Sequence, residues 1–216
     1  MQTEIAPASI PAPQPTPTLI TPQLVAPMFP FAPLANIAAN LPAVLAALAA
    51  AGLDDPPMVL VALATIRAET ASFLPISEGQ SAFNTSPGGA PFDLYDHRKD
   101  LGNLGPPDGA LFRGRGFVQL TGRANYTHFA QQIGQDLVAN PALANQPTIA
   151  AELLARFLAG KELAIRTALA VPFPAGPDLA RARRLVNGGT NGLDRFTAAY
   201  RIGVQLLAKT PQSLQP

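Results

Sequence analysis

The sequence contains no cysteine, and only 13% of its 216 residues are charged. Without cysteine the chain can form neither disulfide bonds nor thiolate metal sites. The formal net charge of +1 disfavours a protein whose main task is to grip nucleic acid or an anionic membrane. Because 48% of the residues are hydrophobic, the chain is suited to one domain of about 180 residues with a core of its own.

Long hydrophobic runs are absent as well. The longest apolar stretch, residues 43–52, has about ten residues, whereas a membrane-spanning helix needs roughly twenty. The segment Met1–Ile5 lacks the basic start and the unbroken apolar run of a signal peptide. We therefore expect no membrane span, and either a cytoplasmic location or export by a non-classical route.

Metal ligands are scarce. His97 and His128 are the only histidines, and neither belongs to a ligand motif. The spacing of Asp93, Asp96 and Asp100 does not match a calcium-binding EF-hand loop. The sequence therefore predicts neither a metal site nor a cofactor.

The distribution of proline divides the chain into two parts. Nine of the 24 prolines fall within residues 1–33, where the composition is typical of an extended polyproline-like chain without helix or sheet. We therefore predict a disordered or extended tail over residues 1–35 and a folded domain over residues 36–210. As an alternative, the proline-rich segment docks on the domain or on a partner through Phe29 and Phe31.

Helical patterns dominate the rest of the chain. Apolar periodicity and capping residues predict helices over 36–51, 56–73 and 123–133, with further helices beginning near residues 147, 178 and 194. Asn36 or Asn40 can cap the first of these, and an acidic cap precedes Pro56. Residues 74–111 predict a long polar loop, and residues 117–120 have the pattern of a short strand. The predicted fold class is mainly α, with one small β element and a long polar loop.

The stretch Phe112–Tyr126 is the densest in residues with special chemistry. Gly114 and Gly116 let the backbone pass close to another segment. On a strand over residues 117–120, Gln119 and Thr121 point to the same side. A glutamine beside a hydroxyl makes a hydrogen-bonding surface for a neutral polar ligand such as a sugar. The alternative interpretation is a tight corner that caps the next helix.

Two glutamates stand out before this stretch. Glu69 falls on the largely apolar helical face of Ala62, Ile66 and Phe73, near the helix C-terminus. The apolar surroundings and the negative end of the helix dipole should both raise the pKa of Glu69, as a general acid requires. Alternatively, Glu69 pairs with a buried arginine. Glu78 adds a second carboxylate, and two carboxylates are the minimal apparatus for glycoside hydrolysis.

Three segments together are similar to glycoside hydrolase family 19, the chitinases and the related phage and bacterial endolysins of the lysozyme-like superfamily. The first is Ala68-Glu-Thr-Ala-Ser-Phe73 followed by Glu78, and the third is Val186-Asn-Gly-Gly189 with Arg201-Ile-Gly203. The second runs from Asp100-Leu-Gly-Asn through Phe112-Arg-Gly-Arg-Gly-Phe-Val-Gln-Leu-Thr-Gly-Arg-Ala-Asn-Tyr126, and it is the specific one. The resemblance covers about residues 40–207 and implies a lysozyme-like fold.

The resemblance implies a role for each matching residue. Glu69 would be the general acid, Glu78 the general base that holds the attacking water, and Thr121 a hydroxyl that positions this water. The family inverts the anomeric centre, which requires carboxyl groups about 6.5–9.5 Å apart. The implied substrate contacts are the amides of Gln119, Asn125 and Asn187, and the implied support of the carboxylates is Arg201.

The sequence also departs from the family pattern. Ala68 replaces the histidine before the catalytic glutamate, Ala71-Ser72 replaces two glycines, and Asn191 stands where plant members have a glutamate. Tryptophan, a common platform for stacking sugars, is absent from the whole chain. The stacking role would therefore fall to an aromatic residue of the second matching segment or of the polar loop that precedes that segment. The candidates are Tyr95, Tyr126, Phe112 and Phe117.

The resemblance implies a glycosidase that cleaves β-1,4 bonds in an N-acetylglucosamine-containing polymer, with peptidoglycan ahead of chitin because the short loops resemble those of endolysins. We expect a monomer whose partner is the polysaccharide and which binds no nucleic acid. The alternative is a catalytically degenerate saccharide-binding or structural module on the same fold. Arg113, Arg115 and Arg123 are too few for a phosphate track, and we expect them to brace the acidic loop.

Overall fold

The computed structural model of the protein describes residues 20–171 and 175–209. In chain order, its helices are α1 Pro22–Val25, α2 Leu34–Ala50, α3 Pro56–Glu69, α4 Asp93–Asp96, α5 Asp108–Leu111, α6 Arg123–Ile133, α7 Pro147–Ala159, α8 Glu162–Leu169, α9 Leu179–Asn187 and α10 Leu193–Lys209. Three 3-10 turns are η1 Ala26–Met28, η2 Lys99–Leu101 and η3 Pro141–Asn145. Strands β1 Ile76–Ser77 and β2 Arg115–Gly116 pair antiparallel. The predicted class, mainly α with one small β element, is confirmed.

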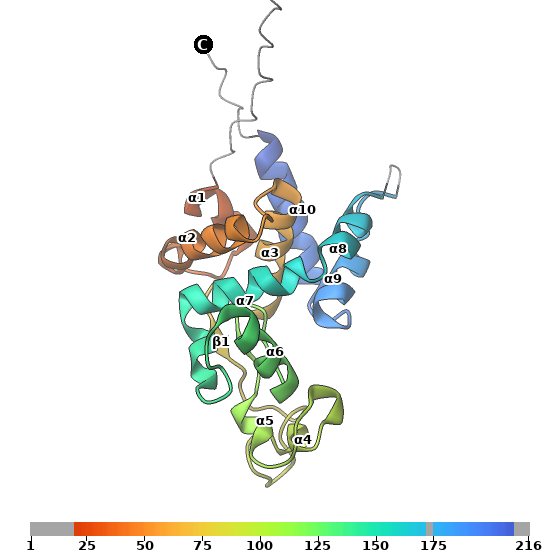
Figure 1. Cartoon of the computed structure of the whole chain (residues 1–216). Coiled ribbons are helices and arrows are strands. Elements are labelled where there is room, and N and C mark those ends of the chain that lie inside the picture. Colours follow the sequence, from red (N-terminus) through yellow and green to blue (C-terminus); the bar gives the residue numbers. More distant parts are fainter. Residues whose placement is uncertain (1–19, 172–174, 210–216) are drawn as a thin grey trace, which may run out of the picture.

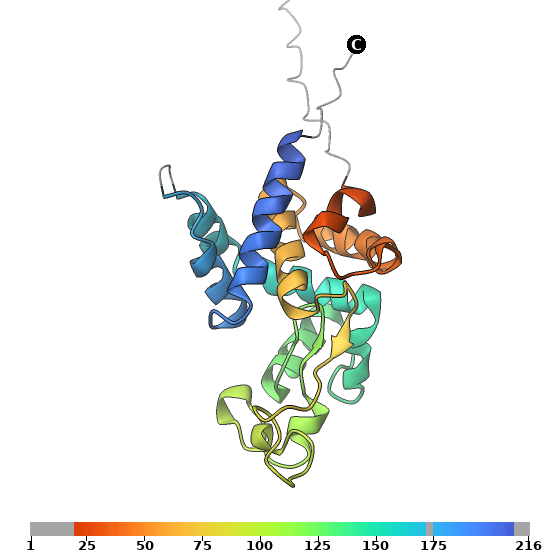
Figure 2. The same ribbon diagram turned by 180° about the vertical axis from the view of Figure 1, so that it is seen from behind.

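Helix α7 runs through the middle of the molecule (Figure 1). On one side of it lie α1, α2, α3 and α10, and α10 packs along α3. On the other side lie α6 and the β pair, while α8 and α9 pack together beside the α3–α10 pair. The segment 74–111, which carries α4, η2 and α5, occupies the end of the molecule opposite α1 (Figure 2).

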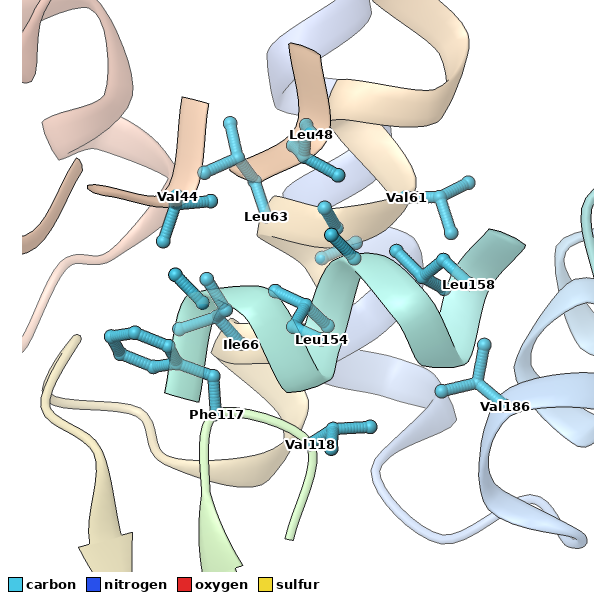
Figure 3. Close-up of a cluster of buried hydrophobic side chains, with 14 of the residues drawn as sticks. Val44, Leu48, Val61, Leu63, Ile66, Phe117, Val118, Leu154, Leu158 and Val186 are labelled. Atoms are coloured by element: carbon cyan, nitrogen blue, oxygen red, sulfur yellow. The ribbon is translucent and has the colours of Figure 1, made fainter. Parts of the chain in front are cut away.

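The core lies where α2, α3 and α7 meet. Every residue of α3 from Met58 to Ala68 is buried, so this helix is surrounded by protein along most of its length. Phe117 and Val118, from the turn after β2, enter the same core from below (Figure 3). The turn is therefore anchored by hydrophobic burial. The helical side chains labelled around it are Val44, Leu48, Val61, Leu63, Ile66, Leu154 and Leu158.

The proline-rich segment is packed where the structure describes it. Val25, Met28 and Phe29 are buried, and the Phe29 ring lies edge-on to Phe73 with the centroids 4.7 Å apart. Phe31 is 81% exposed and lies under the Arg67 guanidinium. The predicted extended chain without helix is therefore wrong for residues 22–28, because burial of these side chains outweighs the extended preference of proline. Docking through Phe29 is the alternative that the structure supports, while residues 1–19 lie outside the described part.

Helix α3 begins as the sequence predicts but ends four residues earlier. Asp55 caps its start by accepting a hydrogen bond from the Met58 amide. Its end is Glu69, and Phe73 has left the helix, with φ 58°. The prediction that Glu69 and Phe73 share a helical face is therefore wrong. The physical reason is tertiary, since Phe73 turns into the core between Phe29 and Phe117.

Two asparagines hold the chain after α3. The Asn36 amide donates to the Ser72 carbonyl at 3.0 Å, and the Asn40 amide donates to the Phe73 carbonyl at 3.1 Å. Neither asparagine caps α2, which begins at Leu34 without a side-chain cap. The first helix of the predicted domain therefore fixes the backbone that immediately follows Glu69.

The predicted strand over residues 117–120 is instead a tight turn. The strand is Arg115–Gly116, and Leu120 returns to Arg115 through two backbone hydrogen bonds of 3.2 and 2.9 Å. Gln119 takes a left-handed conformation, with φ 51°, to close the turn. The turn is favoured over the predicted strand because it buries Phe117 and still pairs the backbone groups of Arg115 and Leu120.

Most other helical predictions agree with the structure. The helix over 123–133 is confirmed and is ended by Gly134, which takes a left-handed conformation, and Asp178 caps α9. Helix α8 was not predicted, and its Arg166 pairs with Asp55 at the start of α3. Among the described residues, no helix combines the length and the apolar character needed to cross a membrane.

Candidate active site

Glu69 ends α3 in a nearly closed environment. Its side chain is 14% exposed, and its Oε1 lies 2.7 Å from Nη1 of Arg183, whose side chain is 2% exposed. Burial raises the pKa of Glu69, while the charges of Arg183 and Arg195 act in the opposite direction. Both sequence interpretations thus apply at once: the carboxyl pairs with a buried arginine, and its pKa is still raised.

Arg183 connects Glu69 to the turn after α9. Its Nε donates to the Asn191 carbonyl at 2.8 Å. A Cβ on Gly192 would lie 3.3 Å from the Cβ of Ala68, so this turn lies against the end of α3. Asn187 is exposed, four residues after Arg183 and hence on the same face of α9. The structure therefore places the predicted Asn187 on the segment that closes over Glu69.

Glu78 follows β1 and has a different environment. Its Oε1 accepts from Nδ2 of Asn84 at 3.0 Å and from the Tyr95 hydroxyl at 2.9 Å. Its Oε2 accepts from the Gly114 amide at 3.1 Å. Burial and the charge of Glu78 raise the pKa of Tyr95 to about 12, so the phenol stays a donor. Three neutral donors therefore fix Glu78 as an acceptor.

Gly114 lies at the point where the other predicted oxygens meet. A Cβ on this glycine would lie 2.8 Å from Oε1 of Gln119 and 3.2 Å from both Oε2 of Glu78 and Oγ1 of Thr121. The Gln119 amide is fixed by the Ile76 and Gly116 carbonyls, both at 3.0 Å. The Thr121 hydroxyl donates to the Gln119 carbonyl at 2.9 Å. Gln119, Thr121 and Glu78 thus come together, through a turn where the sequence predicted a strand.

The remaining predicted amide, Asn125, lies in the first turn of α6. Its side chain is exposed, and Nδ2 donates to the Thr121 carbonyl at 2.7 Å. The structure therefore places it next to Thr121, which together with Glu78 and Gln119 forms what we call the Glu78 cluster.

Three of the four proposed stacking aromatics are corrected by the structure. Tyr126 is fully buried, and its hydroxyl bonds to the Arg113 carbonyl and to Nη1 of Arg115. Phe112 and Phe117 are 1% and 0% exposed. Since none of the three rings reaches the surface, none can contact a polymer. Their burial follows from the apolar stripe of α6 and from the turn that enters the core.

Arg201 is a further correction. It lies on the exposed side of α10 and lines a hollow with Gly176, Leu179 and Gln205. No ion pair joins it to another residue in the described ranges. The arginines whose charges act on Glu69 are Arg183 and Arg195. Sequence reasoning missed Arg183, although its position one helical turn before Asn187 was a usable signal.

The arginines of the Phe112–Tyr126 stretch match their predicted bracing role. Arg123 forms a double hydrogen bond with Asp108, with Nε at 2.7 Å from Oδ2. This bond lowers the pKa of Asp108. Arg113 and Arg115 donate to the carbonyls of α5, Ala110 and Leu111 respectively. The segment 74–111 is thereby tied to the start of α6.

Asn84, which binds Glu78, and its chain neighbour Phe83 escaped the sequence interpretation. Asn84 is 1% exposed and holds Glu78, and the Ser81 amide in turn donates to its Oδ1 at 2.8 Å. The adjacent Phe83 is 90% exposed. No local motif marks either residue. Within residues 20–171 and 175–209, no three His, Cys, Asp or Glu side chains group in a way that could hold a metal ion.

The sequence was compared with family models and with curated proteins. No family model matches the chain. A glycosyl hydrolase family 19 domain-containing protein of Haemophilus influenzae is 27% identical over 112 residues, which is 50% of this chain and 48% of the relative. The chain thus spans about half the length of this curated relative.

Two solved structures share the architecture. Chitinase C from Streptomyces griseus aligns over 88% of this chain and 77% of its own, with a TM-score of 0.56 and 22% identity. A bacterial family 19 chitinase aligns over 89% and 96%, with a TM-score of 0.54 and 21% identity. The predicted resemblance is confirmed: the chain has the lysozyme-like fold of family 19 chitinases, and its sequence is similar to a glycosyl hydrolase family 19 domain.

Proposed function

We propose that the protein is a glycoside hydrolase that cleaves β-1,4 bonds in an N-acetylglucosamine-containing polymer, peptidoglycan or chitin, with inversion. One observation carries the proposal, namely that the two carboxyl groups have opposite environments. Glu69 is enclosed and its pKa is raised, whereas Glu78 is held by three neutral donors. Different environments assign different roles to two carboxyl groups. The similarity to family 19 supports the same reaction.

The two carboxyl groups have separate tasks in the proposed reaction. Glu69 gives its proton to the glycosidic oxygen as the bond from this oxygen to the anomeric carbon breaks. Arg183, 2.7 Å away, stabilises the carboxylate that Glu69 becomes. A water attacks the anomeric carbon from the opposite face and loses its proton to Glu78. Glu78 then releases this proton to solvent and Glu69 takes up a proton from solvent, which restores both carboxyl groups. The hydrolysed anomeric centre is inverted.

The open side of Gly114 is the proposed seat of the attacking water. Oxygens of Glu78, Gln119 and Thr121 converge there, and the absence of a side chain at Gly114 leaves the space. A water at this place would donate to Glu78 and accept from the hydroxyl of Thr121 when that hydroxyl turns from the Gln119 carbonyl. Thr121 and Gln119 thus act by orienting the nucleophile.

Sugar binding is assigned to exposed groups around this centre. Asn125 and Asn187 present exposed amides, the first from α6 and the second from the end of α9. Phe83 replaces the buried aromatics as the stacking surface, because its ring is 90% exposed and the adjacent Asn84 is fixed to Glu78. Tyr95 acts through its hydroxyl on Glu78.

The decisive experiment compares the wild type with Glu69→Gln on purified peptidoglycan and on chitin oligomers. Release of reducing ends should fall by about 10²- to 10⁴-fold in the variant. Glu152→Gln, an exposed glutamate of α7, is the matched control and should retain full activity. NMR of the first product formed should show the inverted anomer.

A degenerate saccharide-binding module is the second candidate. The observation that favours it is the Arg183–Glu69 ion pair together with Ala68 at the position of the family histidine. In that case the wild type and Glu69→Gln would bind the polymer equally and neither would release reducing ends. That outcome would remove the enzyme proposal.

A further inference from the structure

A hollow lies between α6 and the end of α7, beyond the residues assigned to catalysis. We call it the α6–α7 hollow; it has a volume of about 220 Å³. Its polar lining consists of Asn125, His128 and Gln132 from α6, with Arg156 and Lys161 opposite. These three α6 residues are spaced three and four apart and so share one face of the helix.

The charge of the hollow has one sign. Arg156 and Lys161 line it, and no carboxylate does. The Glu152 carboxylate is 3.9 Å from Arg156, but both side chains are more than 40% exposed, so this contact neutralises little of the guanidinium charge. No ion pair joins Lys161 to another residue in the described part of the chain. The hollow thus presents two cations to solvent.

The aromatic rings position these groups. Phe129 and Phe157 stack with centroids 6.0 Å apart and form an apolar floor. The Lys161 ammonium lies 5.3 Å from the centroid of Phe157, so a cation–π contact holds it at the rim. The His128 and Gln132 side chains bond to each other at 3.0 Å. Such a site combines charge with directed hydrogen bonding.

Asn125 links the hollow to Thr121 of the Glu78 cluster. Asn125 lines the hollow and at the same time donates to the Thr121 carbonyl. The face from Asn125 to Gln132 is about 10 Å long, at the rise of an α-helix. A polymer whose scissile sugar lies at Glu78 and Thr121 can therefore reach the hollow with a neighbouring unit.

We propose that the α6–α7 hollow binds a carboxylate carried by the polymer, which makes acidic peptidoglycan, and not neutral chitin, the substrate. The inference rests on the proposed hydrolase function. Every second sugar of peptidoglycan bears a lactyl ether whose carboxyl group is free or extended by a peptide that itself ends in carboxylates. Chitin carries no acid at all. Arg156 and Lys161 would pair with this carboxylate, and Asn125 and Gln132 would bind the sugar amides.

The test measures selectivity. The double variant Arg156→Gln/Lys161→Gln should lower the ratio of kcat/KM on soluble peptidoglycan fragments to that on chitin oligomers by about tenfold, as expected for the loss of charge-assisted contacts. The matched control Arg184→Gln/Lys209→Gln removes the same charges from exposed positions and should leave the ratio unchanged. An unchanged ratio in the first variant would overturn the proposal.

Binding separates this proposal from the hydrolase function. In Glu69→Gln, NMR titration should show that the N-acetylglucosamine–N-acetylmuramic acid disaccharide binds at α6. The affinity for its methyl ester should be about fivefold lower. Equal affinity for acid and ester would overturn the carboxylate site even if the enzyme is active. Preference for the acid in an inactive protein would keep the site and remove the hydrolase. Equal displacement by inorganic phosphate or by a short DNA would reject the polymer carboxylate as the ligand.

Discussion

The environments of Glu69 and Glu78 differ in how they are built. Glu69 stands at the end of a buried helix, and its partner Arg183 comes from another helix, more than a hundred residues later. Glu78 stands in the irregular segment 74–111, and its partners are a hydroxyl, an amide side chain and a backbone amide. The first environment is charged and closed, whereas the second is neutral and polar.

The contrast between these two environments indicates which part of the site depends on the packing of the whole domain. The pKa of Glu69 is raised by burial, a property of the assembled core, while the orientation of Glu78 follows from hydrogen bonds within the 74–114 region. Changes to the helical side should therefore alter proton affinity and stability. Changes on the loop side should alter geometry and leave the core intact.

Gly114→Ala is expected to have the largest effect on catalysis. The new methyl group would lie 2.8 Å from the Gln119 oxygen and fill the proposed water seat, so kcat should fall by about 100-fold. The melting temperature should change little beside this loss, because the nearest atoms are side-chain oxygens that can shift. Gly79→Ala, one residue after Glu78 and with open space around it, is the control. Equal activity of the two variants would refute the water seat.

Arg183→Met tests the charged side. Breaking a buried ion pair should cost about 3 kcal/mol of unfolding free energy, measured by urea denaturation. Without the arginine, the pKa of Glu69 should rise further, because burial still raises it and only the charge of Arg195 still lowers it. A general acid with a higher pKa stays protonated to higher pH, so the alkaline limb of the pH–rate profile should move upward. Arg184→Met is the control and should leave the pH–rate profile unchanged. If the alkaline limb of Arg183→Met also stayed in place, Glu69 would not be the acid.

Asp108→Asn tests the brace beneath the loop side. It should lower the unfolding free energy at pH 7 by about 1–3 kcal/mol, because Arg123 loses a buried charged partner. Since Arg123 lowers the pKa of Asp108, this stabilisation is present above the ordinary value of 3.8 and is lost as the pH falls through the lowered pKa. The difference in unfolding free energy between wild type and Asp108→Asn should therefore become smaller in strong acid. A difference that is constant from pH 7 to pH 2 would exclude the ion pair as its cause.

Phe83→Ala should have the smallest effect. Loss of the exposed ring should raise KM for either polymer by about three- to tenfold, without a change in melting temperature. Phe31→Ala removes another largely exposed ring, which lies outside the Glu78 cluster, and should leave KM unchanged. The same KM for both variants would remove Phe83 from the binding surface.

Local signals in the sequence were sufficient for most of the helices. Asp55, Gly134 and Asp178 are capping residues whose effect does not depend on distant contacts, and the elements that they bound appear as predicted. The end of α3 depends on Asn36, Asn40 and the packing of Phe73, which are invisible in a local pattern. The extent of this helix was therefore overestimated.

The candidate site shows the same division. Glu69, Glu78, Gln119 and Thr121 stood out through their chemistry and motif, and the structure brings the last three together. Tyr126 was misjudged because its burial results from the packing of α6, which a motif does not reveal. Arg201 was chosen from a motif that continues into α10, whereas the contact with Glu69 comes from α9. Sequence identifies reactive side chains better than it identifies their neighbours.

The contact between Glu69 and Arg183 also has a consequence for when the environment of Glu69 forms during folding. The segment that encloses Glu69 belongs to α9 and to the turn that joins it to α10, more than a hundred residues after Glu69. A chain that lacks these helices would carry Glu69 at the open end of a helix, with the proton affinity of an ordinary surface glutamate. The raised pKa of Glu69 is thus a property of the assembled fold, and a fragment that ends before α9 should lack it.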